Sequence, residues 1–282
     1  MSNPILNAKR LVREFPFPAD LLSQIPTEGT YYDGSSSVYF EEDDAVTPEL
    51  LSKTLHYYID IDETESEEEE IPLGASKMKG LPHLPDSIVW PEGTYFFAQL
   101  NLEEFKRFDV ENVFPDKGIL YVFDTVQGEF VLRFYEGPIS DLKRVPYPDE
   151  EDLPEAEYYL EEYRDTTYRL SFEPKFLFYV AGDAYDYRKV AGILPKNLIE
   201  QLSDILKAEL TTWHSSLRIF GRPLFWQGED ERMGGDDEED AEERDLLLFH
   251  SEIGEGHFHI WIDRNDLKQK KFDKAYSSYS GT

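Results

Sequence analysis

The chain contains no cysteine among its 282 residues. Disulfides and thiolate metal ligands are therefore excluded, and the composition suits a reducing compartment. The chain also lacks any run of about eighteen apolar residues, so the sequence predicts no membrane-spanning helix and no membrane partner. The N-terminal segment 1–15 has no apolar stretch followed by small residues, so we expect no signal peptide. These absences together predict a cytoplasmic protein.

Clusters of basic residues are missing as well. The chain has 28 Lys and Arg against 59 Asp and Glu, which gives a formal net charge of −31. Binding through the nucleic-acid backbone requires clustered cations, so the sequence excludes nucleic acid as a partner of that kind. We find no phosphate-binding loop, dinucleotide-binding fingerprint, zinc-ligand set or nucleophile elbow. The sequence thus predicts no cofactor and no metal, identifies no catalytic residue, and leaves open whether the protein is an enzyme.

The acidic excess is concentrated in three runs. They span residues 60–70, 149–162 and 229–245 and hold 27 of the 59 acids. Long blocks of like charge repel themselves, so we predict mobile acidic loops that keep the protein soluble. A second interpretation is an acidic surface that speeds association with a basic partner. Weak calcium binding is a third, but the runs lack the ligand spacing of a calcium-binding loop.

The rest of the pattern predicts an α+β protein with mostly antiparallel strands. Aromatic residues make up 15% of the chain, and aromatic residues favour strands. Residues 94–102 are a clear strand candidate, and residues 117–137 read as a hairpin with its turn near Gln127-Gly128. The best helix candidate spans residues 194–213, where leucine and isoleucine form an apolar stripe. A shorter amphipathic helix is predicted at 3–14.

A weak internal repeat divides the strand-rich part of the chain in two. Gly80-Leu81-Pro82 is followed by Trp90 and two strand candidates, and Gly221-Arg222-Pro223 is followed by Trp226 and two more. Proline fixes φ and glycine permits close backbone approach, so Gly-x-Pro predicts a rigid turn that leads the chain into a sheet. We therefore predict two similar β units packed around one core, in a single domain of residues 1–282. Chance similarity between strand-rich segments is the alternative.

The segment around the first turn carries a family resemblance. The stretches "SKMKGLPHLP", "WP", "FFAQLNL" and "FPDKGILYVFD" resemble the YwqG-like family, a bacterial domain of unknown function. In the second half, "LRIFGRP" and "HIWIDRNDLKQKKFDKAY" are similar to the family pattern as well. The resemblance covers about residues 70–275 and implies a largely antiparallel α+β fold with an internal duplication, but no established activity. Lys79 departs from the pattern, which prefers glycine at that position.

Polar residues of the first unit form the candidate ligand-binding site. Gln99 and Asn101 lie on one face of a strand by its period of two, and with Ser76, Lys77 and Trp90 they could line a cleft. The two amides could equally bind turn backbone, as most side-chain hydrogen bonds do. A Ser-x-x-Lys nucleophile needs both residues on one helix face, so the adjacent pair Ser76-Lys77 argues against a catalytic serine.

Histidines form a second cluster. His257 and His259 share a strand face, with His250 in the preceding strand, and could hold a metal together with a carboxylate. Exposed or cross-strand packing is the more ordinary role, and it is our prediction here. His214 follows the long helix candidate and could interact with the negative end of its dipole. The tryptophans of the two units could form an aromatic cage, but a duplicated aromatic core is the simpler interpretation.

We therefore expect a cytoplasmic binding or interaction protein. The leading hypothesis is that its acid engages a basic protein partner, as the immunity protein of a toxin pair would. The alternative is a small-ligand-binding protein or enzyme that uses a cleft between the two β units. A third possibility is a scaffold whose acidic loops only keep it soluble.

Overall fold

The structure, a computed structural model, describes most of the chain. The described residues are 4–18, 21–24, 28–32, 37–41, 47–53, 55–126, 129–153, 156–178, 196–211, 217–221, 223, 245–253 and 256–281.

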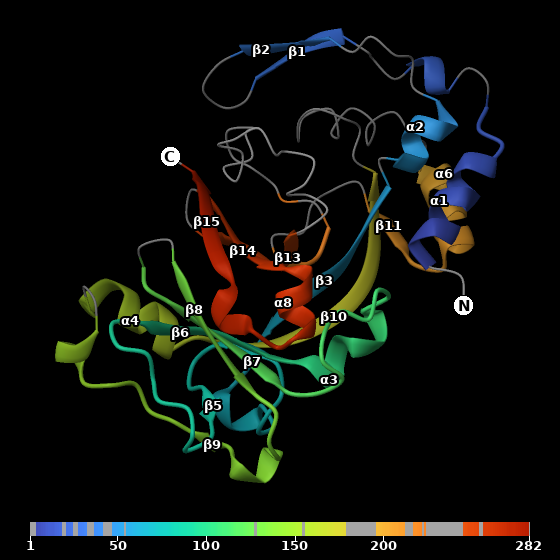
Figure 1. Ribbon diagram of the computed structural model, residues 1–282. Coiled ribbons are helices and arrows are strands. Elements are labelled where there is room, and N and C mark those ends of the chain that lie inside the picture. The colour runs from blue at the N-terminus through green and yellow to red at the C-terminus, as the bar shows by residue number, and fades with distance from the viewer. Residues whose placement is uncertain are drawn as a thin grey trace.

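Within these residues, eleven strands form one large sheet (Figure 1). Ten of them follow the order β15-β14-β13-β12-β3-β10-β4-β6-β7-β8, with every neighbouring pair antiparallel, and β11 pairs parallel to β10. The strands are β3 (Leu55–Glu65), β4 (Lys77–Lys79), β6 (Tyr95–Asn101), β7 (Ile119–Asp124), β8 (Phe130–Tyr135), β10 (Thr167–Phe178), β11 (Glu209–Thr211), β12 (Leu217–Ile219), β13 (Asp245–Ile253), β14 (Gly256–Asp263) and β15 (Tyr276–Gly281).

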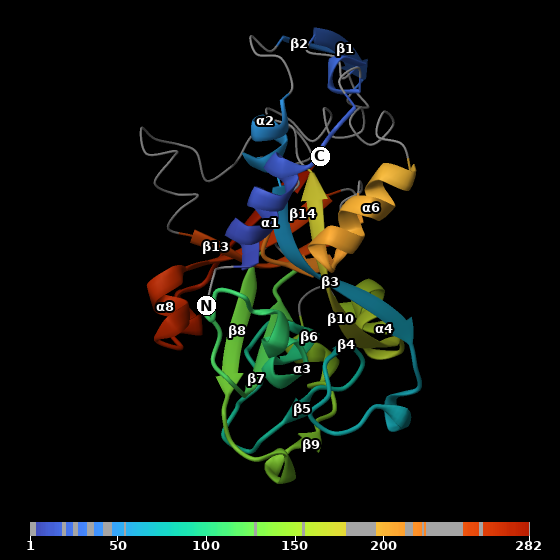
Figure 2. The ribbon, with the colours of Figure 1, turned by 90° about the vertical axis from the view of Figure 1, so that its right-hand side faces the viewer.

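Helices and two short strand pairs flank this sheet. They are α1 (Pro4–Glu14), η1 (Leu22–Gln24), β1 (Glu28–Tyr32), β2 (Ser37–Glu41), α2 (Pro48–Lys53), η2 (Glu68–Glu70), β5 (His83–Leu84), α3 (Leu102–Phe105), η3 (Lys106–Phe108), η4 (Ile139–Asp141), β9 (Lys143–Arg144), η5 (Glu150–Asp152), α4 (Ala156–Arg164), α6 (Lys196–Leu206), α8 (Arg264–Lys268) and η6 (Phe272–Lys274). Helices α1, α2 and α6 group at one end of the sheet, where α1 contacts both of the others (Figure 2). β5 and β9 pair at the opposite end.

The sheet consists of two similar units, as the sequence predicted. From the central pair β3–β10, the strands β4, β6, β7 and β8 extend to one side and β12, β13, β14 and β15 to the other. We call these the first unit and the second unit. The strand that leads into each unit pairs with the other unit, because β3 lies beside β12 and β10 lies beside β4. This exchange joins both units in one sheet.

The local backbone confirms the duplication. At the first turn Lys79 and Gly80 have φ values of 58° and 66°, and at the second turn Phe220 and Gly221 have φ values of 64° and 76°. The second strand of each unit also bulges at the equivalent place: β6 shifts register between Phe96 and Ala98, and β13 shifts between Leu247 and Phe249. Two consecutive residues with positive φ and a bulge recur at matching positions in both units. This agreement argues against chance similarity.

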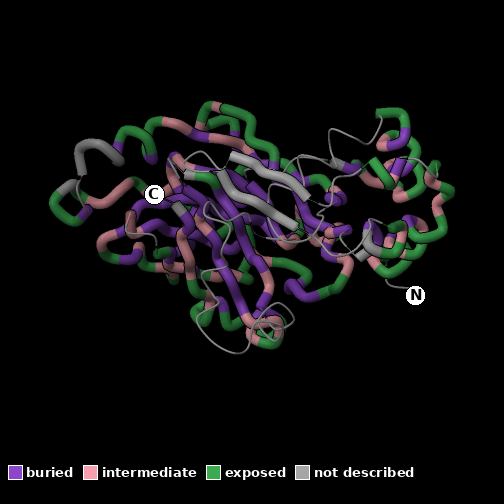
Figure 3. The backbone as a smooth tube through the Cα atoms, turned by 90° about the horizontal axis from the view of Figure 1, so that it is seen from above, coloured by how far each residue is buried: buried purple, intermediate pink, exposed green. Residues whose placement is uncertain are grey.

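The sheet curls until its two edge strands approach each other. The backbone N–H of Phe130 in β8 donates to Ser277 Oγ in β15 over 3.0 Å. The Phe130 ring also packs edge-on against Phe258, with centroids 5.6 Å apart. The curled sheet encloses the main apolar core, and its buried strands run through the middle of the molecule in Figure 3.

A second, smaller core covers the outer face of the first unit. Every residue of β7 is buried: Leu120 and Val122 join the main core, while Tyr121 and Phe123 join the smaller core with Leu84 of β5. Burial on both faces explains the nearly continuous apolar run of this strand.

Some sequence predictions need correction. The helix predicted at 194–213 ends at Leu206 within the described residues, and 209–211 form β11 instead. The hairpin β7–β8 is confirmed, but its turn at Gln127-Gly128 lies outside the described residues. His214 and Trp226 lie outside them too.

The prediction of mobile acidic loops is wrong for the first run. β3 continues to Glu65, paired with β10 along its whole length, and the acids at 68–70 form η2. The inward side chains of Ile59 and Ile61 join the main core, so burial and sheet pairing offset the repulsion between the outward acids. The second run is partly ordered, in η5 and α4. Most of the third run, at 229–244, lies outside the described residues.

Candidate functional site

Four of the five predicted site residues meet beneath the first turn. Lys77 lies opposite Gln99 in the β4–β6 pairing, and Ser76 and Asn101 adjoin them. Ser76, Lys77 and Gln99 are 0% exposed and Asn101 is 8% exposed. The fifth, Trp90, lies elsewhere: its ring packs against Phe123 and Tyr147 in the smaller core.

The two amides hold the turn backbone. Gln99 Oε1 accepts from the His83 N–H over 2.8 Å, and Gln99 Nε2 donates to the Ala75 carbonyl over 2.7 Å. Asn101 Nδ2 donates to the Gly74 carbonyl over 2.8 Å, and its Oδ1 caps α3. The Ser76 hydroxyl accepts from the Asn101 N–H over 2.8 Å. The sequence left open whether the two amides bind a ligand or the turn backbone. The contacts are those of the second alternative, because each amide satisfies buried backbone groups.

Lys77 forms a buried ion pair with an acid of the first run. Its Nζ contacts Glu68 Oε2 and donates to the Leu81 carbonyl over 2.9 Å. The same Glu68 oxygen accepts from the Leu81 N–H over 2.9 Å. The other Glu68 oxygen lies 3.2 Å from Arg144 Nε and 3.4 Å from His83 Nε2. A single carboxylate thus ties η2 to the turn and to β9.

This environment shifts three pKa values. Burial alone would raise the pKa of Glu68, but hydrogen bonds from His83, Lys77 and the Leu81 N–H lower it to about 2. Burial lowers the pKa of Lys77 to about 8, with Glu68 opposing the change. Burial also lowers the pKa of His83. Its Nδ1 faces the Gly74 N–H and the Gln99 amide N–H₂, which assigns the proton to Nε2, facing Glu68.

An acidic depression lies next to this pair. We call it the acidic hollow; it has a volume of about 470 Å³. Its lining residues are Glu65, Ser66, Glu67, Glu68, Glu69, Glu70, Arg164, Asp165, Thr166 and Thr167. The carboxylates of Glu65, Glu67, Glu69 and Glu70 belong to exposed residues, whereas Glu68 turns inward. The one cation of the lining, Arg164, is paired with Asp165 over 2.6 Å.

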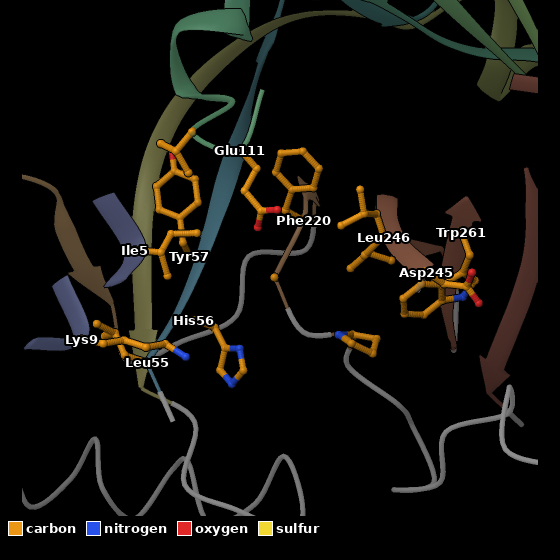
Figure 4. Close-up of a pocket in the computed structure, with 14 residues that line it drawn as sticks. Ile5, Lys9, Leu55, His56, Tyr57, Glu111, Phe220, Asp245, Leu246 and Trp261 are labelled. Carbon is orange, nitrogen blue, oxygen red and sulfur yellow. The ribbon is translucent and has the colours of Figure 1, made fainter. Parts of the chain in front are cut away.

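A second depression lies beside the second turn (Figure 4). We call it the second-turn pocket; its volume is about 270 Å³. Its lining residues are Ile5, Lys9, Leu55, His56, Tyr57, Val110, Glu111, Phe220, Gly221, Pro223, Asp245, Leu246, Leu247 and Trp261. Most of them are apolar or aromatic, in contrast to the acidic hollow.

The two depressions share one part of their lining when the units are aligned by strand register. In the first unit Lys77 pairs with Arg169, and in the second unit Arg218 pairs with Asp60. By this register, residues 164–167, which line the acidic hollow, correspond to residues 55–58 beside the second-turn pocket. The rest of the two linings differs, so the sequence repeat did not indicate either depression.

The histidine cluster lies in the second unit and is buried, with His250 and His259 0% exposed and His257 5% exposed, so of the two predicted roles the structure shows cross-strand packing and not exposure. His250 is opposite His259 in the β13–β14 pairing and opposite Arg218 in the β12–β13 pairing. The His250 ring centroid lies 5.3 Å from that of His257 and 4.9 Å from that of His259. Burial, together with the charge of Arg218, lowers the pKa of His257 to about 4. Among the described residues, no group of three His, Asp or Glu is arranged to hold a metal ion.

Comparison with known families places the chain. Residues 76–280 match a family described as a domain of unknown function, DUF1963. The match covers well over half of the chain, and the protein therefore belongs to this family. The search of curated proteins returned no match. Among the described helices, none is both long enough and apolar enough to cross a membrane.

Proposed function

We propose that this protein binds a basic protein partner through the acidic hollow. The observation that carries the proposal is that β3 and η2 hold a set of carboxylates around one depression. Within the proposal the protein is a cytoplasmic, YwqG-like bacterial protein, and inhibition of a basic toxin by an immunity protein is one concrete form of it.

The charge around the hollow supports this assignment. The exposed acids on these elements and on α4 are Asp62, Glu63, Glu65, Glu67, Glu69, Glu70, Glu161, Glu162 and Asp165. The cations around the hollow are already engaged: Lys77 and Arg144 contact Glu68. Lys79 pairs with Glu162 over 2.6 Å, and Arg164 pairs with Asp165. The surface therefore keeps a strong negative potential, which attracts lysine and arginine side chains and speeds their association.

Order in the hollow distinguishes it from a mobile acidic tail. Glu68 anchors η2 through its contacts to Lys77 and Leu81, and the Ser66 N–H donates to the Thr167 carbonyl over 3.0 Å. A partner that binds here does not need to order the acidic segment, so less conformational entropy is lost on binding.

The test compares two sets of four neutralised acids. The hollow variant carries Glu65→Gln, Glu67→Gln, Glu69→Gln and Glu70→Gln; the control variant carries Glu92→Gln, Glu103→Gln, Glu129→Gln and Asp273→Asn, all exposed and outside the hollow. Both variants lose four negative charges. With fluorescent decalysine as the probe, we expect the hollow variant to bind about tenfold more weakly than wild type and the control variant within about twofold.

A pull-down from native cytoplasm at low and high salt completes this test. The proposal expects a basic protein that elutes at high salt and that the hollow variant fails to retain. Equal losses in both variants would show that only net charge matters, and a partner retained by the hollow variant would place the interface elsewhere.

A small-ligand function is the second candidate. The residues predicted to line a cleft, Lys77, Gln99 and Asn101, are instead enclosed and bound to turn backbone. The observation that favours a ligand is the second-turn pocket, because its lining combines elements of both units with α1.

A further inference from the structure

The second-turn pocket has the composition of a small-molecule site. Ligand pockets are mostly apolar with a few placed polar groups, and the lining of this pocket has that composition. Its volume of about 270 Å³ is slightly below the range of about 300–1,000 Å³ that is usual for such pockets, so it suits only a small ligand. Its aromatic walls come from Tyr57 on β3, Phe220 after β12 and Trp261 on β14 (Figure 4). A ring-bearing molecule of modest size fits this volume.

Two of the aromatic walls are fixed in place. The Tyr57 hydroxyl donates to the Phe108 carbonyl over 2.7 Å, and the Trp261 indole N–H donates to Ser278 Oγ over 3.0 Å. The Tyr57 ring also packs edge-on against Phe176, with centroids 5.3 Å apart. Rings held in this way do not need to be ordered by a ligand, which lowers the entropic cost of binding.

The acidic groups of the pocket are already engaged by the protein. Glu111 is paired with Arg264 from α8. Asp245 is 6% exposed, and its Oδ2 accepts from the Tyr276 hydroxyl over 2.9 Å. Neither carboxylate depends on a ligand for a partner.

The cation of the pocket is different. Lys9 projects from α1 at the wall of the pocket (Figure 4), and within the described part of the chain its ammonium group makes neither an ion pair nor a hydrogen bond. The neighbouring bases of α1 are engaged, since Arg10 pairs with Glu14 over 2.6 Å and Arg13 lies 3.8 Å from Glu49. Burial lowers the pKa of Lys9, which is the effect of a partly desolvated ammonium group that lacks a counter-charge.

We propose that the second-turn pocket binds a small aromatic anion, with its ring between Tyr57, Phe220 and Trp261 and its carboxylate or equivalent acid on Lys9. An apolar body satisfies the walls, and a single negative charge satisfies the ammonium group. This site is separate from the acidic hollow and selects the opposite charge, so each proposal can fail without the other.

Three probes of one shape test the charge preference. They are 3-phenylpropanoate, its neutral amide and the matching amine, titrated by ligand-detected NMR against the full chain. We expect the carboxylate to bind about tenfold more tightly than the amide, because a hydrogen bond to a charged group in a half-buried site is worth about that factor. The amine should bind more weakly than either.

Three variants test the site. Lys9→Met keeps the apolar stem and removes the charge, and it should equalise the affinities of carboxylate and amide; Lys9→Gln should give the same result. Lys117→Met removes an exposed lysine outside the pocket and should leave the preference unchanged. Val110→Trp should fill the pocket and weaken all three probes. Thermal unfolding confirms that each variant is folded.

Several outcomes would overturn the proposal. They are amide or amine binding as tightly as the carboxylate, a preference that survives both Lys9 substitutions, unchanged binding in Val110→Trp, or no binding of the carboxylate at all.

Discussion

Replacing Glu68 by alanine is expected to lower the free energy of unfolding by about 3–5 kcal/mol, the cost of leaving one partner of a buried ion pair alone. Lys77 is 0% exposed, so its ammonium group would lose its counter-charge without gaining water. The substitution also removes the acceptor of the Leu81 N–H and a neighbour of Arg144.

Equilibrium unfolding in urea measures this effect, with neighbouring acids as controls. Glu67→Ala and Glu69→Ala remove the same charge from exposed residues of the same run and should change the free energy of unfolding by no more than about 0.5 kcal/mol. The double variant Glu68→Gln/Lys77→Met should recover much of the loss, because neither buried charge remains. If Glu68→Ala behaves like Glu69→Ala, the ion pair does not stabilise the fold.

The pH dependence of this effect has a defined sign. The folded-state pKa of Glu68, about 2, is below the ordinary value of about 4.3. The ionised carboxylate therefore stabilises the folded state at pH values above about 4.3, and this contribution is lost as the pH falls toward 2. We expect the difference in stability between wild type and Glu68→Ala to be full at pH 7 and to shrink below pH 4.

Replacing Gln99 by alanine is expected to cost about 3 kcal/mol of stability, because each buried polar group left unpaired costs about 1–3 kcal/mol. The His83 N–H and the Ala75 carbonyl would each lose their partner. His83 Nδ1 would lose one of its two hydrogen-bond donors. Since the side chain is 0% exposed, water could replace these contacts only by entering the cavity that the substitution leaves.

The same unfolding experiment checks this prediction, with Gln201→Ala as the matched control. Gln201 is an exposed residue of α6, so its substitution should stay within about 0.5 kcal/mol of wild type. If Gln99→Ala keeps wild-type stability but loses binding of a ligand, the result would instead support the ligand-binding cleft that the sequence suggested.

The duplicated turns were predictable because their signal is local. Gly80 and Gly221, each followed by proline two residues later, mark the two turns at which two consecutive residues have positive φ values. The positive φ of Lys79 could not be predicted in the same way. A lysine in place of the family's glycine gives no sign of a positive φ, yet its φ is 58°. The strand pattern of β6 and β7 was equally readable, because both faces of these strands are buried.

The role of Glu68 could not be predicted from local pattern. It stands among four consecutive glutamates, and only the tertiary fold selects one of them to turn inward. A search for the acid that neutralises Lys77 could have identified Glu68. The sequence did not show that Lys77 is buried, so it gave no reason for this search. The exchange of β3 and β10 between the units was hidden for a similar reason. Paired residues such as Lys77 and Arg169, or Asp60 and Arg218, are far apart in the sequence, and strand periodicity does not specify partners.

The second-turn pocket was missed because its lining is assembled from separate segments. Lys9 comes from α1, Tyr57 from β3, Val110 from the turn after η3, Phe220 from the second turn and Trp261 from β14. No continuous stretch of sequence contains more than three residues of the pocket lining. The site therefore has no sequence motif by which it could be recognised.

The central claim is that the first acidic run is an ordered part of the fold, anchored at Glu68, and presents its other carboxylates from a fixed surface. Amide hydrogen exchange measures this directly. The N–H groups of Ser66, Gly80 and Leu81 bond to the Thr167 carbonyl, the Tyr163 carbonyl and the Glu68 carboxylate, so we expect slow exchange at all three in wild type and faster exchange at Leu81 in Glu68→Ala. Exchange in wild type at the rates of an unstructured peptide would contradict the claim.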